Sequence, residues 1–273
     1  MLARIKIIIG HFLVKLLPKK AKRLSEKGVT LNFKLNRIER LMKDAILYRT
    51  ERQFDYENLA ELHKNNWINQ GKYFFEITDS RFQNDFLPND SFIFDLLKEH
   101  LSTNEHSFST LIEIGTGNGN VLNYLSDKFP ELTKLIGIDL SAEQVAINND
   151  KYKDNERMKF VATDGYDWII NHAKSNTIFV TYAGVLEYFT EKKLSEFLKF
   201  VHKLGKTIFV AVEPIALDHD FSVNPNTQLY GMERSFSHNY QKLFEDAGFN
   251  LWHESKGKYI NDQYCFCFIG AES

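Results

Sequence analysis

Three glycines and two acids near the middle of the chain have the types and spacing of a nucleotide site. Gly115, Gly117 and Gly119 alternate in one short stretch, directly after a hydrophobic run. Glycine lets the backbone adopt conformations barred to other residues and lets a ligand approach it closely. Glu113 precedes the turn, and Asp139 follows 24 residues after Gly115. Nucleotide-binding βαβ units place a carboxylate on a ribose hydroxyl at that distance, so the expected chemistry is binding of a ribose-containing cofactor.

A strand, a tight turn and a helix that begins near 118–120 would position these residues. Beyond Leu111 the chain alternates strand and helix, which predicts an α/β fold with a mostly parallel sheet and helices on both faces. Ser141 is the expected N-cap of the next helix, with Gln144 completing a capping box. Ligands of such sheets bind at the carboxyl ends of the strands. The strands are expected near 110–115, 134–139, 158–162, 177–182, 207–212, 249–255 and 262–269.

The glycine spacing separates two kinds of nucleotide site. LIEIGTGNGNV (residues 111–121) reads E-x-G-x-G-x-G instead of the dinucleotide fingerprint G-x-G-x-x-G. It resembles the first motif of the class I S-adenosylmethionine-dependent methyltransferases. LIGIDLS (135–141) is similar to the second motif of that family, and VATDGYDW (161–168) is similar to the third. TIFVTYAGVLEYF (177–189) resembles the fourth strand and its loop, and LFEDAGF (243–249) the helix end before an antiparallel hairpin.

The resemblance covers residues 108–273 and implies a seven-stranded, Rossmann-like sheet with a C-terminal antiparallel hairpin. It implies S-adenosyl-L-methionine as cofactor, with Asp139 on the ribose and Asp164 accepting a hydrogen bond from the adenine amino group. Taken alone, Asp139 also suits a turn and Asp164 a helix cap. The expected cofactor-binding residues are Glu113, Gly115, Thr116, Gly117, Gly119, Asp139, Leu140, Asp164 and Gly165.

An oxygen acceptor of the methyl group generally needs a base. Candidates lie on the loops after the fourth and fifth strands, and the loop from Glu213 to His238 is expected to cover the site. His238 is the preferred base, because a nearby helix N-terminus would hold it and favour its neutral form. His219 and Glu213 are the further catalytic candidates, although a solvated or capping role is open for each histidine. No metal site is expected, and the other candidates are Glu187, Tyr188, Asp218 and Asp220.

The class of methyl acceptor is narrowed mainly by motifs that the sequence lacks. Residues 182–185 lack the Asn/Asp-Pro-Pro-aromatic motif of methylases that act on base amino groups, and the net charge of −2 argues against a nucleic-acid partner. Methyltransferases of the family's small-molecule branch often carry Leu-Glu-His in this loop. This chain has Tyr188 in place of the His, so a base at this position is in doubt. We therefore expect O-methylation of a small molecule or glycan, including a surface-polysaccharide or lipid-linked precursor. A nicotinamide-dependent oxidoreductase and a non-catalytic binding module are the alternatives.

The N-terminal part of the chain differs in sequence character from the rest. We therefore expect two domains, an N-terminal extension of residues 1–100 and a Rossmann-like domain of residues 101–273. The first 23 residues carry seven Lys or Arg and no acid. Their apolar stretch, Ile5 to Leu17, is too short and interrupted to span a bilayer and has the period of a helix ended by Pro18. That helix suits an anionic membrane surface, or docking on its own domain or on a second subunit of a homo-oligomer.

Residues 31–54 also have a helical period, whereas Trp67 to Asp90 is aromatic-rich without one. The latter segment is expected to be either a lid or substrate wall, or an irregular packed connector. Composition fits a soluble cytoplasmic enzyme, with a peripheral position at the inner face of the membrane as a further expectation. Cys265 and Cys267 alternate on an expected strand and should be two packed thiols.

Overall fold

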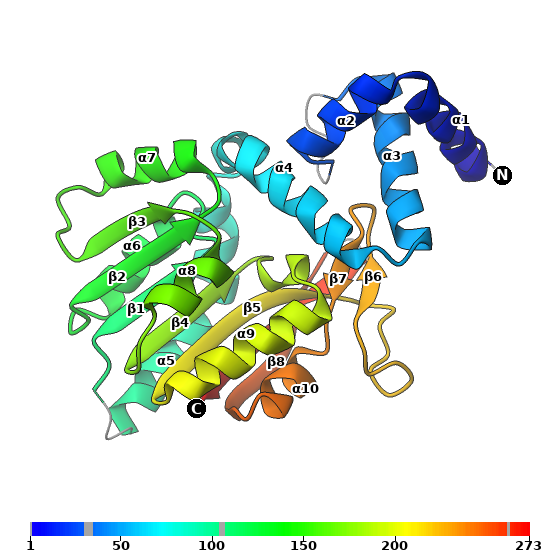
Figure 1. Ribbon diagram of the computed structural model, residues 1–273. Coiled ribbons are helices and arrows are strands. Elements are labelled where there is room, and N and C mark those ends of the chain that lie inside the picture. The colour runs from blue at the N-terminus through cyan, green and yellow to red at the C-terminus, as the bar shows by residue number, and fades with distance from the viewer. Residues whose placement is uncertain (1, 30–34, 104–106, 261–262) are drawn as a thin grey trace.

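The computed structural model describes residues 2–29, 35–103, 107–260 and 263–273. Its C-terminal part is built on one seven-stranded sheet in the order β3-β2-β1-β4-β5-β9-β8 (Figure 1). The strands β1 to β5 run parallel, and β9 lies antiparallel between β5 and β8. The strands are β1 (Thr110–Ile114), β2 (Lys134–Asp139), β3 (Met158–Ala162), β4 (Thr177–Tyr182), β5 (Thr207–Ala216), β8 (Asn250–Ile260) and β9 (Tyr264–Glu272).

Helices cover both faces of this sheet, because alternate strand residues feed two separate cores. Ile112 and Phe179 pack against one layer of helices, while Leu111 and Ile178 pack against the other. Cys265 and Cys267 belong to the first core, which confirms two packed thiols on one face. The first layer is α8 (Gly165–His172), α9 (Glu191–Leu204) and α10 (Tyr240–Asp246). The second layer is α5 (Phe92–Thr103), α6 (Asn120–Lys128) and α7 (Ala142–Lys151).

The expected fold class is confirmed, down to the antiparallel pair after α10. Parallel strands β1 to β4 bring their carboxyl ends to the same edge, which is where ligands of such sheets bind. The position of β9 between β5 and β8 also departs from the order 3-2-1-4-5-6 of dinucleotide-binding sheets.

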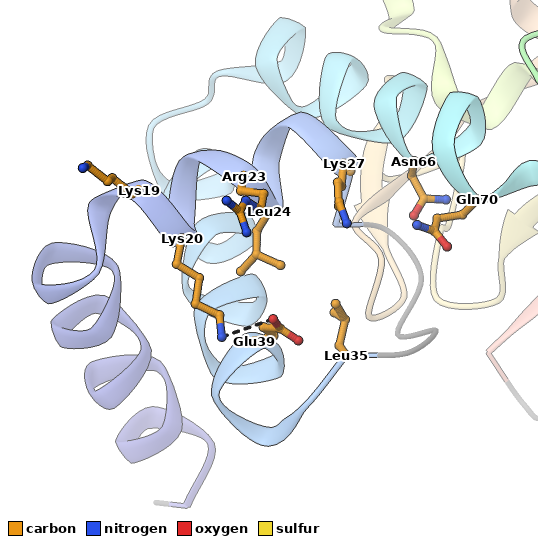
Figure 2. Close-up of a pocket in the computed structure, with 10 residues that line it drawn as sticks. Lys19, Lys20, Arg23, Leu24, Lys27, Leu35, Glu39, Asn66 and Gln70 are labelled. Atoms are coloured by element: carbon orange, nitrogen blue, oxygen red, sulfur yellow. Dashed lines mark ion pairs between the residues drawn. The ribbon is translucent and has the colours of Figure 1, made fainter.

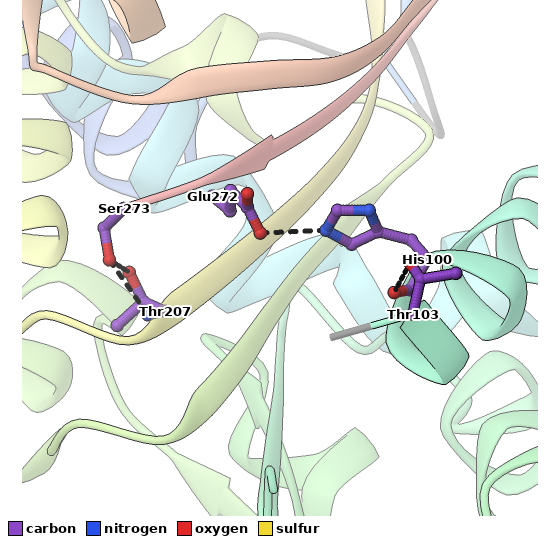
Figure 3. Close-up of polar contacts among 5 residues, drawn as sticks. All are labelled: His100, Thr103, Thr207, Glu272 and Ser273. Atoms are coloured by element: carbon purple, nitrogen blue, oxygen red, sulfur yellow. Dashed lines mark hydrogen bonds and ion pairs between the residues drawn. The ribbon is translucent and has the colours of Figure 1, made fainter. Parts of the chain in front are cut away.

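Polar contacts fix the opposite edge of the sheet, where the chain ends (Figure 3). The imidazole Nε2 of His100 on α5 lies 2.9 Å from a carboxylate oxygen of Glu272 on β9. The Thr207 N–H at the start of β5 donates to the Ser273 Oγ over 2.9 Å. These contacts anchor the last strand in the sheet at a distance from the ligand-binding edge.

The N-terminal helices form a third hydrophobic core. Leu24, Met42 and Leu62 belong to it, and Phe236 joins it to the rest of the molecule. Figure 1 shows α1 at the outer side of this group and α4 running across toward α7. The helices are α1 (Leu2–Leu16), α2 (Pro18–Lys27), α3 (Arg37–Arg52) and α4 (Tyr56–Ile77). Within the described residues, no helix has the length and apolar character needed to span a bilayer.

The boundary of α1 is as expected, since α2 begins at Pro18. The period of residues 31–54 corresponds to α3, although its first expected residue, Leu31, lies outside the described residues. Of the two alternatives for the aromatic segment, the irregular connector is wrong. Most of it belongs to α4 and to the π-helix η1 (Phe82–Asp90), where aromatic side chains pack on one another.

Two smaller expectations also need correction. Ser141 caps α7 by accepting from the Gln144 N–H, but the Gln144 side chain donates to Asn148 instead of closing a capping box. The loop from Glu213 to His238 is not irregular throughout. Its second half forms a two-stranded ribbon of β6 (Gln228–Tyr230) and β7 (Ser235–Ser237).

Candidate active site

The glycine turn after β1 needs backbone conformations that favour glycine. The φ angles of Gly115, Gly117 and Gly119 are 71°, 53° and 74°. The turn is held against β2, because the N–H groups of Gly115 and Thr116 both donate to the Ile138 carbonyl. Helix α6 then begins at Asn120, as predicted. The turn and the helix N-terminus thus present backbone at the carboxyl edge of the sheet.

Glu113 lies beneath this turn and is 2 % exposed. One of its carboxylate oxygens accepts from the Thr116 hydroxyl. Burial raises the Glu113 pKa to about 8, with the Thr116 hydrogen bond opposing the rise and the Asp139 charge adding to it. Glu113 therefore braces the turn from below, and its contact with the cofactor stays a prediction.

Asp139 is fixed at the end of β2 by backbone donors. Its two carboxylate oxygens accept from the Gly117 N–H at 3.0 Å and from the Ser141 N–H at 2.8 Å. Burial raises the Asp139 pKa to about 6 against these hydrogen bonds. Each oxygen has a second lone pair, so the carboxylate can also accept from ribose hydroxyls. Leu140, the next expected cofactor residue, is half-buried beside it.

Asp164 caps α8 by accepting from the backbone N–H groups of Tyr166 and Asp167. Its other oxygen forms an ion pair with Lys64 at 2.8 Å. Burial raises the Asp164 pKa, but the Lys64 hydrogen bond and the Lys193 charge outweigh burial and leave that pKa below its usual value. The capping role is thus present, and an adenine contact stays a prediction.

Gly165 explains why the start of α8 can approach the glycine turn so closely. A Cβ at this position would lie 2.5 Å from the Ile114 side chain at the end of β1. Any larger residue would push α8 away from β1. Gly165 is therefore better described as a packing requirement of the edge than as a group that donates to a ligand.

Helix α4 and the residues after it lie across this edge. Gly71 packs on Ser141, and the Phe75 ring is so close to the turn that a Cβ on Gly117 would lie 2.8 Å from it. Beyond the helix, Asp79 accepts from the side chain of Asn118 at 2.9 Å. With the Lys64–Asp164 ion pair, these contacts follow the edge from β3 to β1. The aromatic segment is therefore positioned as a wall of the expected cofactor site.

The loop after β4 forms the neighbouring side of the site. Ala183 and Gly184 have φ angles of 61° and 98°, and they turn the chain so that Val185 packs on Gly115. Glu213 on β5 holds this loop by accepting from the N–H groups of Val185 and Leu186 at 2.9 and 3.0 Å. Burial raises the Glu213 pKa to about 7 against these hydrogen bonds. Glu213 thus positions the loop through its Oε2 atom, and its expected catalytic role stays a prediction.

Glu187 lies in the short helix η2 (Leu186–Tyr188) and is buried. Its Oε2 accepts from the Tyr230 hydroxyl of β6. Burial raises the Glu187 pKa to about 8, and the charges of Glu233 and Glu213 add to the rise while Tyr230 opposes it. The ring of the adjacent Tyr188 lies 5.7 Å from that of Trp67 on α4. An acid with a hydroxyl partner and aromatic walls can orient a polar acceptor and take its proton.

Both ring nitrogens of His219 contact groups within the loop from Glu213 to His238. Its Nε2 lies 3.1 and 2.9 Å from the carbonyl oxygens of Asn224 and Asn226, and its Nδ1 lies 2.9 Å from the Ser237 Oγ. Two carbonyl partners place the hydrogen on Nε2. His219 therefore closes the loop from 219 to 226.

His238 is fully buried, at 0 % exposure. Its Nε2 donates to the Phe189 carbonyl and its Nδ1 lies 2.6 Å from the Thr227 hydroxyl. Burial lowers the His238 pKa to about 4, so the neutral form is favoured as predicted, although the main cause is burial. With both nitrogens bonded within the protein, no contact of His238 supports its expected role as base.

Some groups at the edge were not predicted from the sequence. Lys64 belongs to a stretch that carries no motif, and it reaches the edge only because α4 folds back over it. Asp79 lies in the segment that was expected to form a lid or substrate wall, but its contact with Asn118 was not predicted. Glu187 was considered as a base but not preferred. The pairing with Tyr230, 43 residues later, is what distinguishes it from the other acids.

Comparisons with known proteins identify the domain that carries this site. A family model described as a methyltransferase domain matches residues 111–207. A solved S-adenosylmethionine-dependent methyltransferase from Clostridium acetobutylicum is similar with a TM-score of 0.51 and 13 % identity, covering 73 % of this chain and 98 % of that one. One from Leishmania major has a TM-score of 0.51 and 9 % identity, covering 76 % of this chain and 84 % of that one. No curated protein matches the chain.

Residues 111–207 therefore form a methyltransferase domain, and S-adenosylmethionine is the cofactor of this enzyme. The family model spans the glycine turn, Asp139 and Asp164 in their predicted order. The two alternatives, a nicotinamide-dependent oxidoreductase and a non-catalytic binding module, are set aside by this assignment.

Proposed function

We propose that this enzyme transfers the methyl group of S-adenosylmethionine to an oxygen of a small molecule or glycan, including a surface-polysaccharide or lipid-linked precursor. The observation that carries the proposal is the buried Glu187–Tyr230 pair beside the loop that contacts the glycine turn. A hydroxyl acceptor needs a base, whereas the methyl group is already activated by the sulfonium charge.

The cofactor would lie along the carboxyl edge, between the sheet and α4. In this arrangement Asp139 accepts from the ribose, and Asp164 lies at the adenine end. Gly115 and Val185 would hold the methionine end, and η2 follows directly in the chain. The N-terminal part, 1–100, would act as a lid, because Phe75 and Trp67 exclude water from the same edge.

The transfer itself is an in-line displacement. The acceptor oxygen attacks the methyl carbon, the carbon–sulfur bond breaks, and S-adenosylhomocysteine leaves. The proton of the acceptor hydroxyl passes to the Glu187 carboxylate. Tyr230 orients that carboxylate through its hydroxyl, and Glu213 holds the loop on which it stands. Proximity and alignment supply most of the remaining acceleration in such reactions.

We also propose a cytoplasmic location with peripheral contact of residues 1–23 with the inner face of the membrane. The basic and apolar character of these residues supports that position and, with it, a glycan or lipid-linked acceptor. No nucleic-acid partner is proposed, and a homo-oligomer stays a prediction.

The acceptor class can be tested with isotope-labelled S-adenosylmethionine and separated glycan, lipid, small-molecule, protein and nucleic-acid fractions of a cell extract. We expect label in a methyl ether of a glycan or small molecule, identified by mass spectrometry after acid hydrolysis. Label found only on nitrogen would contradict O-methylation, and label only in the nucleic-acid fraction would contradict the acceptor class. A Glu187→Gln variant serves as the control for signal from the proposed site.

A further inference from the structure

Positive charge is concentrated in the first two helices. Residues 1–28 contain eight Lys or Arg and one acid, whereas the rest of the chain contains 26 Lys or Arg and 35 acids. Helix α2 alone has five of these cations, and its single acid, Glu26, pairs with Lys22. An excess of one sign on one element attracts ligands of the opposite sign. The expected ligand of this region is therefore an anion.

The cations of α2 line a pocket of about 500 Å³ between α2, α3 and α4 (Figure 2). Lys20 is neutralised by Glu39 of α3, with which it forms an ion pair at 3.2 Å. Arg23 and Lys27 form no ion pair among the residues that the structure describes. Figure 2 shows the tip of Lys19 pointing outward, away from the other lining residues. The pocket thus offers one guanidinium and one ammonium group that form no ion pair among the described residues, with the Glu39 charge near Lys27.

Two amides complete the polar lining. Asn66 and Gln70 are one turn apart on α4 and face the pocket from the side opposite α2 (Figure 2). Helix α4 also approaches the end of α2 closely, because a Cβ on Gly28 would lie 2.1 Å from the Asn66 backbone nitrogen. Guanidinium, ammonium and amide donors around one space are the groups that bind phosphate oxygens.

The neighbouring helix α1 indicates which kind of molecule would bring a phosphate group to this pocket. Ile8, Phe12 and Leu16 are 67 %, 64 % and 61 % exposed, and they lie at helical spacing on one stripe. The other side of α1 packs through Gly10 against α3. By the same spacing, Lys6 and Lys15 flank the stripe on its two sides. An exposed apolar stripe flanked by lysines is typical of helices that lie in the headgroup region of an anionic membrane.

We propose that the pocket lined by Arg23, Lys27, Asn66 and Gln70 is a binding site for a phosphate-bearing ligand. The stripe on α1 favours the headgroup of an anionic phospholipid as the source of that phosphate, with a soluble phosphorylated compound as the other source. Arg23 binds two phosphate oxygens through its planar fork, Lys27 contributes a point charge, and the amides bind the remaining oxygens. The site is separate from the methyl-transfer edge and does not depend on the proposed acceptor.

The test compares variants that remove one positive charge each from α2. Arg23→Gln and Lys27→Gln alter the pocket, while Lys22→Gln is the matched control, because Lys22 lies on the same helix outside the pocket lining. The full-length protein is titrated by calorimetry with inorganic phosphate and with soluble glycerol phosphate. Flotation is measured with vesicles of phosphatidylcholine, with and without phosphatidylglycerol. Circular dichroism and cofactor affinity check that each variant is folded.

We expect Arg23→Gln and Lys27→Gln to weaken binding to the anionic vesicles clearly more than Lys22→Gln, which should cost at most the roughly fivefold loss of one surface charge. The site is also supported if the parent protein binds the soluble phosphates and the two pocket variants do not. If the protein then fails to float with the vesicles, the ligand is a soluble phosphorylated compound. Equal losses in all three variants would show a diffuse basic surface and overturn the proposal. Failure to bind either kind of phosphate would overturn it as well.

Discussion

Replacing Glu187 by Gln gives the sharpest test of the proposed chemistry. The substitution keeps the size of the side chain and an acceptor oxygen for the Tyr230 hydroxyl, but it removes the group that takes the proton. Loss of a general base typically lowers the rate by about 100- to 10,000-fold. Cofactor affinity should stay unchanged, because Glu187 lies on the acceptor side of the Val185 loop.

The pH dependence follows from the Glu187 pKa of about 8. Only the ionised carboxylate acts as base, so about one tenth of the enzyme is active at pH 7 and about nine tenths at pH 9. We expect kcat/KM to rise about tenfold between these two pH values and this rise to be lost in Glu187→Gln. The Glu233 charge raises the Glu187 pKa and the Tyr230 hydrogen bond lowers it. Glu233→Gln should therefore move the profile to lower pH, and Tyr230→Phe should move it to higher pH.

The assay is initial-rate methyl transfer with labelled cofactor and the acceptor found in the fractionation experiment, from pH 6 to 9.5. Cofactor affinity measured by calorimetry at each pH separates binding from chemistry. A Glu187→Gln enzyme that keeps both its turnover and its pH profile would refute the assignment of the base. Opposite shifts in the other two variants would refute the electrostatic reasoning even if Glu187 proves essential.

Four further outcomes are expected. Asp139→Ala should weaken S-adenosylmethionine binding by about 1–3 kcal/mol, and an unchanged affinity in calorimetry would exclude the ribose role. Gly117→Val should lower both stability and cofactor affinity, because the φ of 53° costs a branched residue about 1–2 kcal/mol and the side chain would meet Phe75; denaturation and titration curves check this. His238→Ala should retain turnover within about tenfold and lose about 1–3 kcal/mol of stability, since its buried partners are left unpaired; lost turnover at full stability would restore it as base. The raised Glu113 pKa means that its contribution to stability is full below the usual value of 4.5 and is lost as the pH rises through about 8, so thermal unfolding of Glu113→Gln should depend less on pH across that window than that of the parent protein.

The sheet and its ligand edge were predictable because their signals are local. Each strand is a short apolar run next to a turn or a cap, and Gly115, Gly117 and Gly119 adopt the left-handed backbone that their spacing indicated. The position of Asp139 followed from counting along the chain. These features depend on residues within one βαβ unit, so a single sequence contains the information.

The walls of the site were not predictable in the same way. The contacts of Lys64 with Asp164 and of Phe75 with Gly117 join segments that are far apart in the chain, and neither partner marks the other in the sequence. His238 was favoured for its residue type and for a nearby helix N-terminus. In the structure it is buried, and the carbonyl of Phe189 and the hydroxyl of Thr227 contact its nitrogens. Burial and pairing are tertiary properties, so the catalytic side of the site required the structure.

Helix α4 is shared by two regions that have no residue in common. Asn66 and Gln70 line the basic pocket, while Lys64, Gly71 and Phe75 of the same helix contact the cofactor edge. A rigid helix cannot shift at one of these places without shifting at the other. If the cofactor and a pocket ligand both bind more tightly to one position of α4, each raises the affinity for the other by the same factor. The fold thus contains the structural requirement for reciprocal allosteric coupling between an anion and the methyl donor.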